Sequence, residues 1–184
     1  MKKLPYSVRP AAEEDLFQVV DIEARSNRPP WAIEAFRAEL EKPHAHFWVV
    51  TDNETDAEVL AYAVFALPAD QAHIQTVAVR PDHRRQGLAQ HLLRKMISFA
   101  MKNEADSLIL ELRKGNEAAM KLYQSVGFDV IRSQEKFYPD GEGAYVMVYK
   151  TEREKLSGDP DVDFDAGGDA EKLPIGADGK PNLN

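Results

Sequence analysis

The chain has 184 residues, which is enough for one domain with its own hydrophobic core. Its 31 acidic side chains outnumber 23 basic ones, and the resulting formal charge of -8 argues against a general nucleic-acid binder. The chain has no cysteine, which excludes disulfides, thiolate metal ligands and a cysteine nucleophile.

In chain order, we expect a strand, two helices, three strands, a helix, a strand, a helix and two final strands. The strands are predicted at residues 6–9, 46–51, 59–67, 74–79, 107–112, 128–132 and 144–150. Acidic residues open the first helix after residue 12, and Pro29-Pro30 separates it from a second short helix.

Two further helices follow from clear local signals. Apolar residues at helical spacing predict one face of a long helix, at Leu88, Leu92, Met96 and Phe99. Asn116 is a good N-cap for the next helix and Gly127 its natural stop. The long helix joins strands 74–79 and 107–112 in a parallel crossover. We therefore predict a mixed α/β fold, with one parallel pair in a mostly antiparallel sheet and helices at its sides.

The acidic excess is concentrated at the C-terminus, because residues 157–184 hold seven acidic and two basic side chains. The few apolar residues there follow neither a helical nor a strand period, so their burial cannot offset the entropy of ordering. We predict a folded domain over residues 1–156 and a disordered acidic tail over 157–184. Residues 1–5 lack the apolar stretch of a signal peptide, and no apolar run is long enough for a membrane span. The expected location is the cytoplasm, without contact to membrane or nucleic acid.

Residues 76–89 read TVAVRPDHRRQGLA, a strand that passes through a basic loop into a helix N-terminus. The first N–H groups of a helix lack internal partners and carry positive charge. Gly87 and Ala89 keep bulky side chains away, and Arg84 and Arg85 add charge. The stretch predicts a phosphate or pyrophosphate site. It lacks the Lys-Ser/Thr of a Walker loop and the three glycines of a Rossmann fingerprint.

This spacing resembles motif A of the GNAT acetyltransferases, R/Q-x-x-G-x-G/A, with Arg84, Gly87 and Ala89 in the fixed places. Later residues resemble the L-E-V-R-x-x-N…A…L-Y…G-F pattern of protein N-terminal acetyltransferases, at Leu110–Arg113, Asn116, Ala119, Leu122-Tyr123 and Gly127-Phe128. The ending, Phe137–Glu142 and Ala144–Met147, looks most like the RimI-type ribosomal-protein alanine N-acetyltransferases. The resemblance covers about residues 6–150.

The resemblance implies the GNAT fold, in which the two central parallel strands splay apart, and acetyl-CoA as cosubstrate. Pantetheine would pair with the strand before motif A, and the pyrophosphate would lie on the loop N–H groups. The implied cofactor-binding residues are Val77, Ala78, Val79, Arg84, Arg85, Gln86, Gly87, Leu88, Ala89, Gln90 and Asn116.

The resemblance also implies two catalytic residues. Glu111 matches the general base that makes the acceptor amine neutral, and Tyr123 the general acid that protonates the leaving thiolate. A backbone N–H near Val77 would face the oxyanion of a tetrahedral intermediate if the family's strand bulge is kept. Trp31 and Tyr138 are the expected substrate contacts, although Gly143 stands where the family usually has Asp.

The implied reaction is acetyl transfer to the N-terminal α-amine of a protein, with a ribosomal protein that begins with alanine as the expected acceptor. Two alternatives remain: a GNAT enzyme for a small-molecule amine or a lysine side chain, and a non-catalytic acetyl-CoA-binding module. The five histidines have no metal-ligand spacing, so no metal is predicted.

Overall fold

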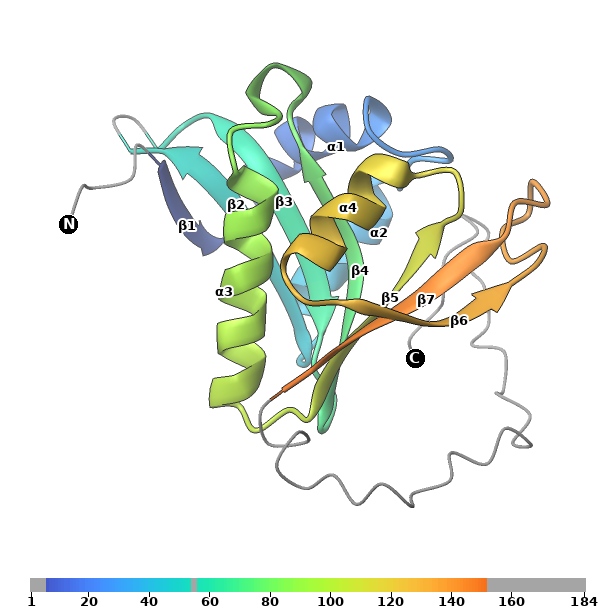
Figure 1. Ribbon diagram of the computed structural model, residues 1–184. Helices are drawn as coiled ribbons and strands as arrows, with labels where there is room; N and C mark the ends of the chain where they lie inside the picture. The colour runs from blue at the N-terminus through green and yellow to red at the C-terminus, as the bar shows by residue number, and fades with distance from the viewer. Residues whose placement is uncertain (1–5, 54–55, 152–184) are drawn as a thin grey trace.

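The computed structural model describes residues 6–53 and 56–151, and within them seven strands form one sheet (Figure 1). The strand order is β1-β2-β3-β4-β5-β7-β6. The strands are β1 (Tyr6–Pro10), β2 (Ala45–Asp52), β3 (Val59–Ala66), β4 (Gln71–Val79), β5 (Ser107–Arg113), β6 (Asp129–Gln134) and β7 (Ala144–Lys150). Only β4 and β5 pair in parallel within this sheet, which confirms the predicted mixed topology.

Helices cover both faces of the sheet. They are α1 (Leu16–Ala24), α2 (Ile33–Glu41), α3 (Leu88–Lys102) and α4 (Glu117–Ser125), with 3-10 turns at Glu13–Asp15 and Pro81–His83. In the view of Figure 1, α3 and α4 lie in front of the sheet, and α1 and α2 lie behind it. Because the central strand β3 has helices on both sides, every one of its residues is buried.

Two hydrophobic clusters fill the spaces between these layers. The predicted apolar face of α3 packs against the sheet through Leu88, Leu92 and Met96, while Phe99 is only partly buried at the cluster's edge. The second cluster joins α1 and α2 to the other face of the sheet, at Leu16, Val19, Ile22, Trp31, Phe36, Phe47, Val49, Val59, Tyr62, Val64 and Ala78. Burial of these side chains supplies the main driving force for folding.

The central parallel pair separates along its length. Backbone pairing between β4 and β5 runs over Gln71–His73 and Ser107–Ile109 and does not continue to Val79 among the described residues. Figure 1 shows the two strands diverging toward the end at which α4 begins. This is the splayed pair that the resemblance implied, and it leaves one backbone edge of Val77–Val79 free of strand pairing with β5.

A β-bulge shapes the same strand. Val64 of β3 pairs with Thr76, but the next residue, Phe65, pairs with Ile74, so Gln75 is the extra residue in β4. Bulges bend a strand and change the direction of the backbone groups that follow. This one lies two residues before Val77, near the position at which the resemblance implied a bulge.

The elements occur in the predicted order, with shifted bounds. The second helix begins at Ile33 rather than at Trp31, because the backbone of Ala32 is extended, with ψ of 159°, and forms the N-cap. The Trp31 backbone N–H, just before it, donates to the buried Glu23 carboxylate. Strand β4 begins at Gln71 rather than Ile74, since the first three residues pair with β5. The predicted tail, residues 157–184, lies outside the described residues.

Candidate active site

A cavity of about 530 Å³, here called the α3 cavity, lies where β4 runs into α3. Ten of the eleven predicted cofactor-binding residues line it; the exception is Gln86, whose side-chain amide lies toward the Asp82 carbonyl oxygen. Its wall consists of Ser26, Asn27, Val77, Ala78, Val79, His83, Arg84, Arg85, Gly87, Leu88, Ala89, Gln90, Asn116, Ala118, Ala119, Leu122 and Tyr123.

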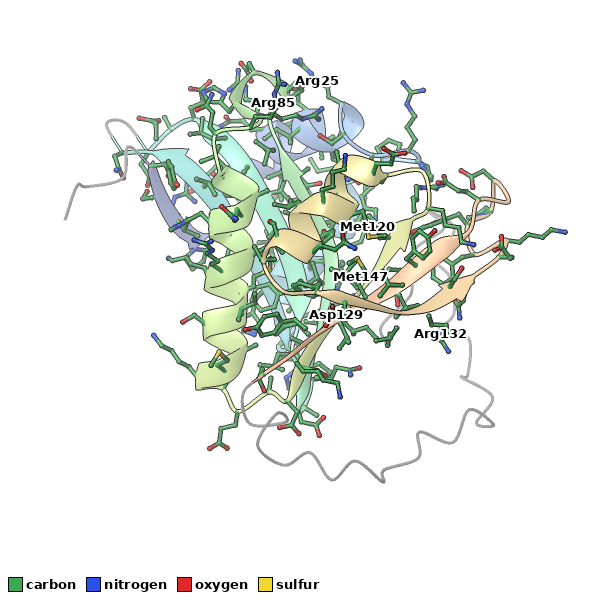
Figure 2. The ribbon with its side chains drawn as sticks, viewed as in Figure 1. Arg25, Arg85, Met120, Asp129, Arg132 and Met147 are labelled. Atoms are coloured by element: carbon green, nitrogen blue, oxygen red, sulfur yellow. The ribbon has the colours of Figure 1, made fainter. Side chains whose placement is uncertain are left out.

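The N-terminus of α3 provides an anion-binding edge in this cavity. Gly87 caps the helix with φ of 84°, a conformation that glycine adopts without strain, and a Cβ there would meet nothing within 4 Å. The free N–H groups of the first turn carry the positive end of the helix dipole. Arg85 adjoins them, and Figure 2 shows its side chain at the same edge of the molecule as that of Arg25.

Arg84 and Arg85, the two arginines of the motif A loop, make different contacts. The Arg84 guanidinium donates to the Val79 carbonyl at 3.1 Å and to Ser26 Oγ at 2.9 Å, so it links the α3 loop to the segment after α1. Arg85 has a positive φ of 59° and no such link among the bonds described. Of the two, Arg85 is therefore the side chain available to an anion.

A second cavity of about 570 Å³, here called the Glu111 cavity, adjoins the first. It lies between the segment after α1, the splayed parts of β4 and β5, and the loop between β6 and β7. Its wall consists of Ala24, Arg25, Ser26, Asn27, Arg28, Pro29, Gln75, Thr76, Val77, Glu111, Leu112, Arg113, Asn116, Ala119, Tyr123, Tyr138, Asp140 and Glu142. The two cavities share six residues, which we call the junction: Ser26, Asn27, Val77, Asn116, Ala119 and Tyr123.

Glu111 lies near the end of β5 with its side chain only 18% exposed. His73 Nε2 is 2.7 Å from Glu111 Oε2, and His73 Nδ1 is buried with no hydrogen-bond partner in the described part of the chain. From this pattern we assign the histidine proton to Nε2, which then donates to the carboxylate. The bond engages Oε2 and leaves Oε1 for the Glu111 cavity.

Tyr123 reaches the junction from α4. It packs edge-on against Phe128, with ring centroids 5.6 Å apart, and only 9% of the residue is exposed. Burial, with a smaller contribution from Tyr138, raises the pKa of Tyr123 above its ordinary value. Its hydroxyl therefore holds a proton throughout the neutral range.

Asn116 acts as the N-cap of α4, as predicted, and its Oδ1 accepts the Ala119 N–H at 3.1 Å. It also lines both cavities. The cap keeps α4 in register, and so positions Tyr123 two turns further along the helix. Gly127 ends the helix with φ of 101°, which confirms the predicted stop signal.

Arg113 contacts three residues of the loop between β6 and β7. Arg113 donates to Asp140 at 2.8 Å and to Glu142 at 2.7 Å, and its guanidinium lies 3.8 Å from the centre of the Tyr138 ring. Hydrogen bonds from the Gly115 N–H and from Arg113 lower the pKa of Glu142. Burial raises the pKa of Tyr138 to about 12, so this residue stays neutral beside the cavity.

The predicted site residues do not all meet. Glu111, Tyr123 and Tyr138 line one cavity, whereas Trp31 is 5% exposed and packs against Phe36 in the core, outside both cavity walls. Trp31 is thus a core residue of the segment between α1 and α2, and the structure does not place it where the sequence predicted a substrate contact. Sequence reasoning missed His73, because its partner lies 38 residues away and only the parallel register of β4 and β5 brings the pair together.

The described residues contain no cluster of three or more His, Cys, Asp or Glu side chains placed to hold a metal ion. They also contain no helix with the length and apolar character needed to cross a membrane.

The GNAT acetyltransferase family model matches residues 16–128, which include β4, the motif A loop, β5 and α4. The chain belongs to the GNAT acetyltransferase family. A relative named ribosomal protein bS18-alanine N-acetyltransferase, from Escherichia coli, is 31% identical over 70% of this chain and 84% of its own length. The N-alpha-acetyltransferase RimI of Mycobacterium tuberculosis is 29% identical over 85% of this chain and 96% of its own length.

Solved structures agree with the sequence comparisons. The crystal structure of the Escherichia coli ribosomal-protein-S18-alanine N-acetyltransferase superposes with a TM-score of 0.71 at 30% identity, over 79% of this chain and 93% of that one. The structure of Ard1 from Thermoplasma volcanium, at 23% identity, shows the same fold with a TM-score of 0.73 over 80% and 99%. The predicted GNAT fold, the N-acetyltransferase class and the likeness to RimI-type enzymes are confirmed.

Proposed function

We propose that this protein transfers the acetyl group of acetyl-CoA to the N-terminal α-amine of a protein. The observation that carries the proposal is the junction, where a cavity with an anion-binding helix end meets a cavity with a fixed carboxylate. The expected acceptor is a ribosomal protein that begins with alanine, because the RimI-type relatives carry that activity in their names. Such a reaction belongs in the cytoplasm.

The α3 cavity fits acetyl-CoA in two respects. The edge of Val77–Val79 that faces away from β3 can pair with the amides of pantetheine, and the N-terminus of α3 can bind the pyrophosphate. When bound, acetyl-CoA supplies the acetyl group as a thioester whose carbonyl carbon an amine can attack. The residues that would hold it are Val77–Val79, Arg85 and the first turn of α3.

Glu111 is the proposed general base. An α-amino group has an ordinary pKa of about 7.7–8.0, so most of it is protonated at pH 7 and cannot attack. The carboxylate accepts that proton directly or through one water molecule. His73 donates to Oε2 and so fixes the side-chain rotamer, which keeps Oε1 directed at the Glu111 cavity. We assign His73 a positioning role.

Tyr123 is the proposed general acid, since its buried hydroxyl keeps its proton and lies at the junction. It gives this proton to the sulfur as the carbon–sulfur bond breaks, which avoids the release of a bare thiolate. The backbone N–H of Val77, which follows the bulge at Gln75, is the proposed donor to the negative charge that develops on the carbonyl oxygen.

Mass spectrometry tests this proposal. Peptides that begin with alanine, serine or methionine, each with one internal lysine, are incubated with acetyl-CoA and the protein. We expect acetylation of the α-amine and not of the lysine, and no product from the same peptides with a blocked N-terminus. Modification of lysine alone, or of a polyamine or aminoglycoside alone, would assign the protein to another acceptor class, and acetyl-CoA binding without turnover would mark a binding module.

A further inference from the structure

A buried carboxylate lies beneath the segment that joins α1 to α2. Glu23 is 0% exposed at the end of α1. Its Oε1 accepts the Trp31 N–H at 2.9 Å, and its Oε2 accepts hydrogen bonds from the Tyr62 hydroxyl and from Asn27 Nδ2. Glu23 therefore connects Asn27 and Trp31, both in the joining segment (residues 25–32), to Tyr62 of strand β3.

The Glu23 side chain is the acceptor in each of these three hydrogen bonds, which favours a carboxylate at this position. Burial and the adjacent Glu23 carboxylate raise the pKa of Tyr62 well above its ordinary value, so Tyr62 keeps its proton and donates it. The backbone N–H of Trp31 and the Asn27 amide nitrogen are also donors. An amide at position 23 would turn an NH₂ group toward at least one of the three donors, and a buried donor would lose its partner.

Asn27 is fixed in one orientation by this arrangement. Its Nδ2 donates to Glu23 Oε2 and lies 3.4 Å from Thr76 Oγ1. Because the amide nitrogen is engaged on the buried side, the carbonyl oxygen Oδ1 is the amide atom left for the cavities. Asn27 belongs to the junction, which it shares with Val77 and Tyr123.

We propose that Asn27 binds the acceptor, with its Oδ1 accepting a hydrogen bond from an N–H of the attacking amine, and that Glu23 is the positioning residue that orients Asn27. The inference rests on the proposed function, since it requires an amine acceptor in the Glu111 cavity. It assigns Glu23 an effect on the reaction although its buried carboxylate lines neither cavity.

A neutral acceptor suits this position. An attacking amine must keep its lone pair directed at the thioester carbon, so its N–H groups need acceptors elsewhere. A second carboxylate beside the amine, in addition to Glu111, would further favour the protonated form, which cannot attack. The amide oxygen of Asn27 can orient the N–H without that effect, and Glu111 remains the group that removes the proton.

The first test is truncation of the amide. We expect Asn27→Ala to lower kcat/KM for the acceptor about 5- to 10-fold, as for the loss of one hydrogen bond. The factor should be the same for peptides that begin with alanine, serine or methionine, because the bond is to the amine and not to the first side chain. The Kd of acetyl-CoA, measured by calorimetry, should be unchanged. The matched control is Asn103→Ala, an amide truncation at the C-cap of α3, which lies outside both cavity walls.

The second test separates positioning from a purely structural role. Glu23→Gln should lower acceptor kcat/KM by a factor similar to that of Asn27→Ala, and the double variant should be no slower than the slower single variant. If the fold-losses in acceptor kcat/KM of the two single variants multiply in the double variant, Glu23 does not act through Asn27. If Glu23→Gln does not fold, the Asn27→Ala variant alone still tests the proposal. An acceptor kcat/KM equal to that of the wild type, or a loss that depends on the first residue of the peptide, would overturn it. An inactive wild-type protein would instead refute the proposed function.

Discussion

Gly143 offers a steric test of the loop that forms one wall of the Glu111 cavity. A Cβ at this position would lie 2.6 Å from the Gln134 carbonyl oxygen and 2.9 Å from Lys114 Cε. The lysine side chain can turn away, but the carbonyl belongs to a residue that pairs with Ala144 between β6 and β7. Substitution must therefore move the backbone of one of these strands.

The expected cost of Gly143→Ala is about 1–3 kcal/mol, the usual range for overpacking a tight contact. In a domain of about 150 residues, each kcal/mol lowers Tm by about 2–4 °C, so we expect a decrease of about 2–12 °C. Gly143→Asp, which introduces the residue usual in the family, should cost at least as much here. The assay is thermal unfolding followed by circular dichroism, with Ser133→Ala on the exposed edge strand β6 as control.

The same substitution should affect the reaction. The Gly143 carbonyl accepts the Lys114 N–H at 3.1 Å, and Gly143 directly follows the wall residue Glu142. We expect a higher KM for the acceptor peptide and an unchanged Kd for acetyl-CoA. A Gly143→Ala variant with a Tm within about 1 °C of wild type would refute the close approach of the two strands, and with it this account of the wall.

Three further outcomes are expected. Tyr123→Phe should lower kcat about 10²- to 10⁴-fold, the range for loss of a general acid, while the protein binds acetyl-CoA as before; unchanged kcat would remove Tyr123 from the mechanism. Arg113→Met should raise the KM for the acceptor, because it removes the contacts of Arg113 with both Glu142 and Tyr138. A KM equal to that of the wild type would show that Arg113 does not shape the acceptor site. Asp15→Asn should lower Tm at pH 7: burial opposes the charged carboxylate, but hydrogen bonds lower the Asp15 pKa overall. A lowered Asp15 pKa stabilises the folded state above the unfolded pKa of about 3.9, and this stabilisation is lost as the pH falls below that value. The difference in Tm between wild type and Asp15→Asn should therefore shrink near pH 3. A difference that stays constant with pH would contradict this linkage.

Much of the fold follows from local signals in the sequence. The apolar spacing of α3, the Asn116 cap and the Gly127 stop each depend on residues within a few turns of one another, and the structure confirms them. The motif A stretch is also local, since a strand, a loop and a helix N-terminus follow one another directly. These are the features that sequence periodicity and capping chemistry describe well.

Other features depend on how distant segments meet. The insertion of β7 between β5 and β6 is set by packing and not by any local pattern. The His73–Glu111 bond requires the register of the parallel pair. The Arg84 guanidinium is engaged by Ser26 and the Val79 carbonyl, and this contact between distant segments could not be read from the motif alone. Trp31 is buried because its backbone N–H donates to the Glu23 carboxylate and its ring packs against Phe36.

A crystal structure with a bisubstrate analogue, in which CoA is joined through an acetyl group to the α-amine of an alanine peptide, would show whether the two cavities bind cosubstrate and acceptor as proposed. We expect CoA along Val77–Val79 with its pyrophosphate at the N-terminus of α3, and the peptide nitrogen at the junction within reach of Glu111 and Asn27. A peptide that leaves the junction on any path outside the Glu111 cavity, or a nitrogen beyond one water molecule from Glu111, would contradict this arrangement.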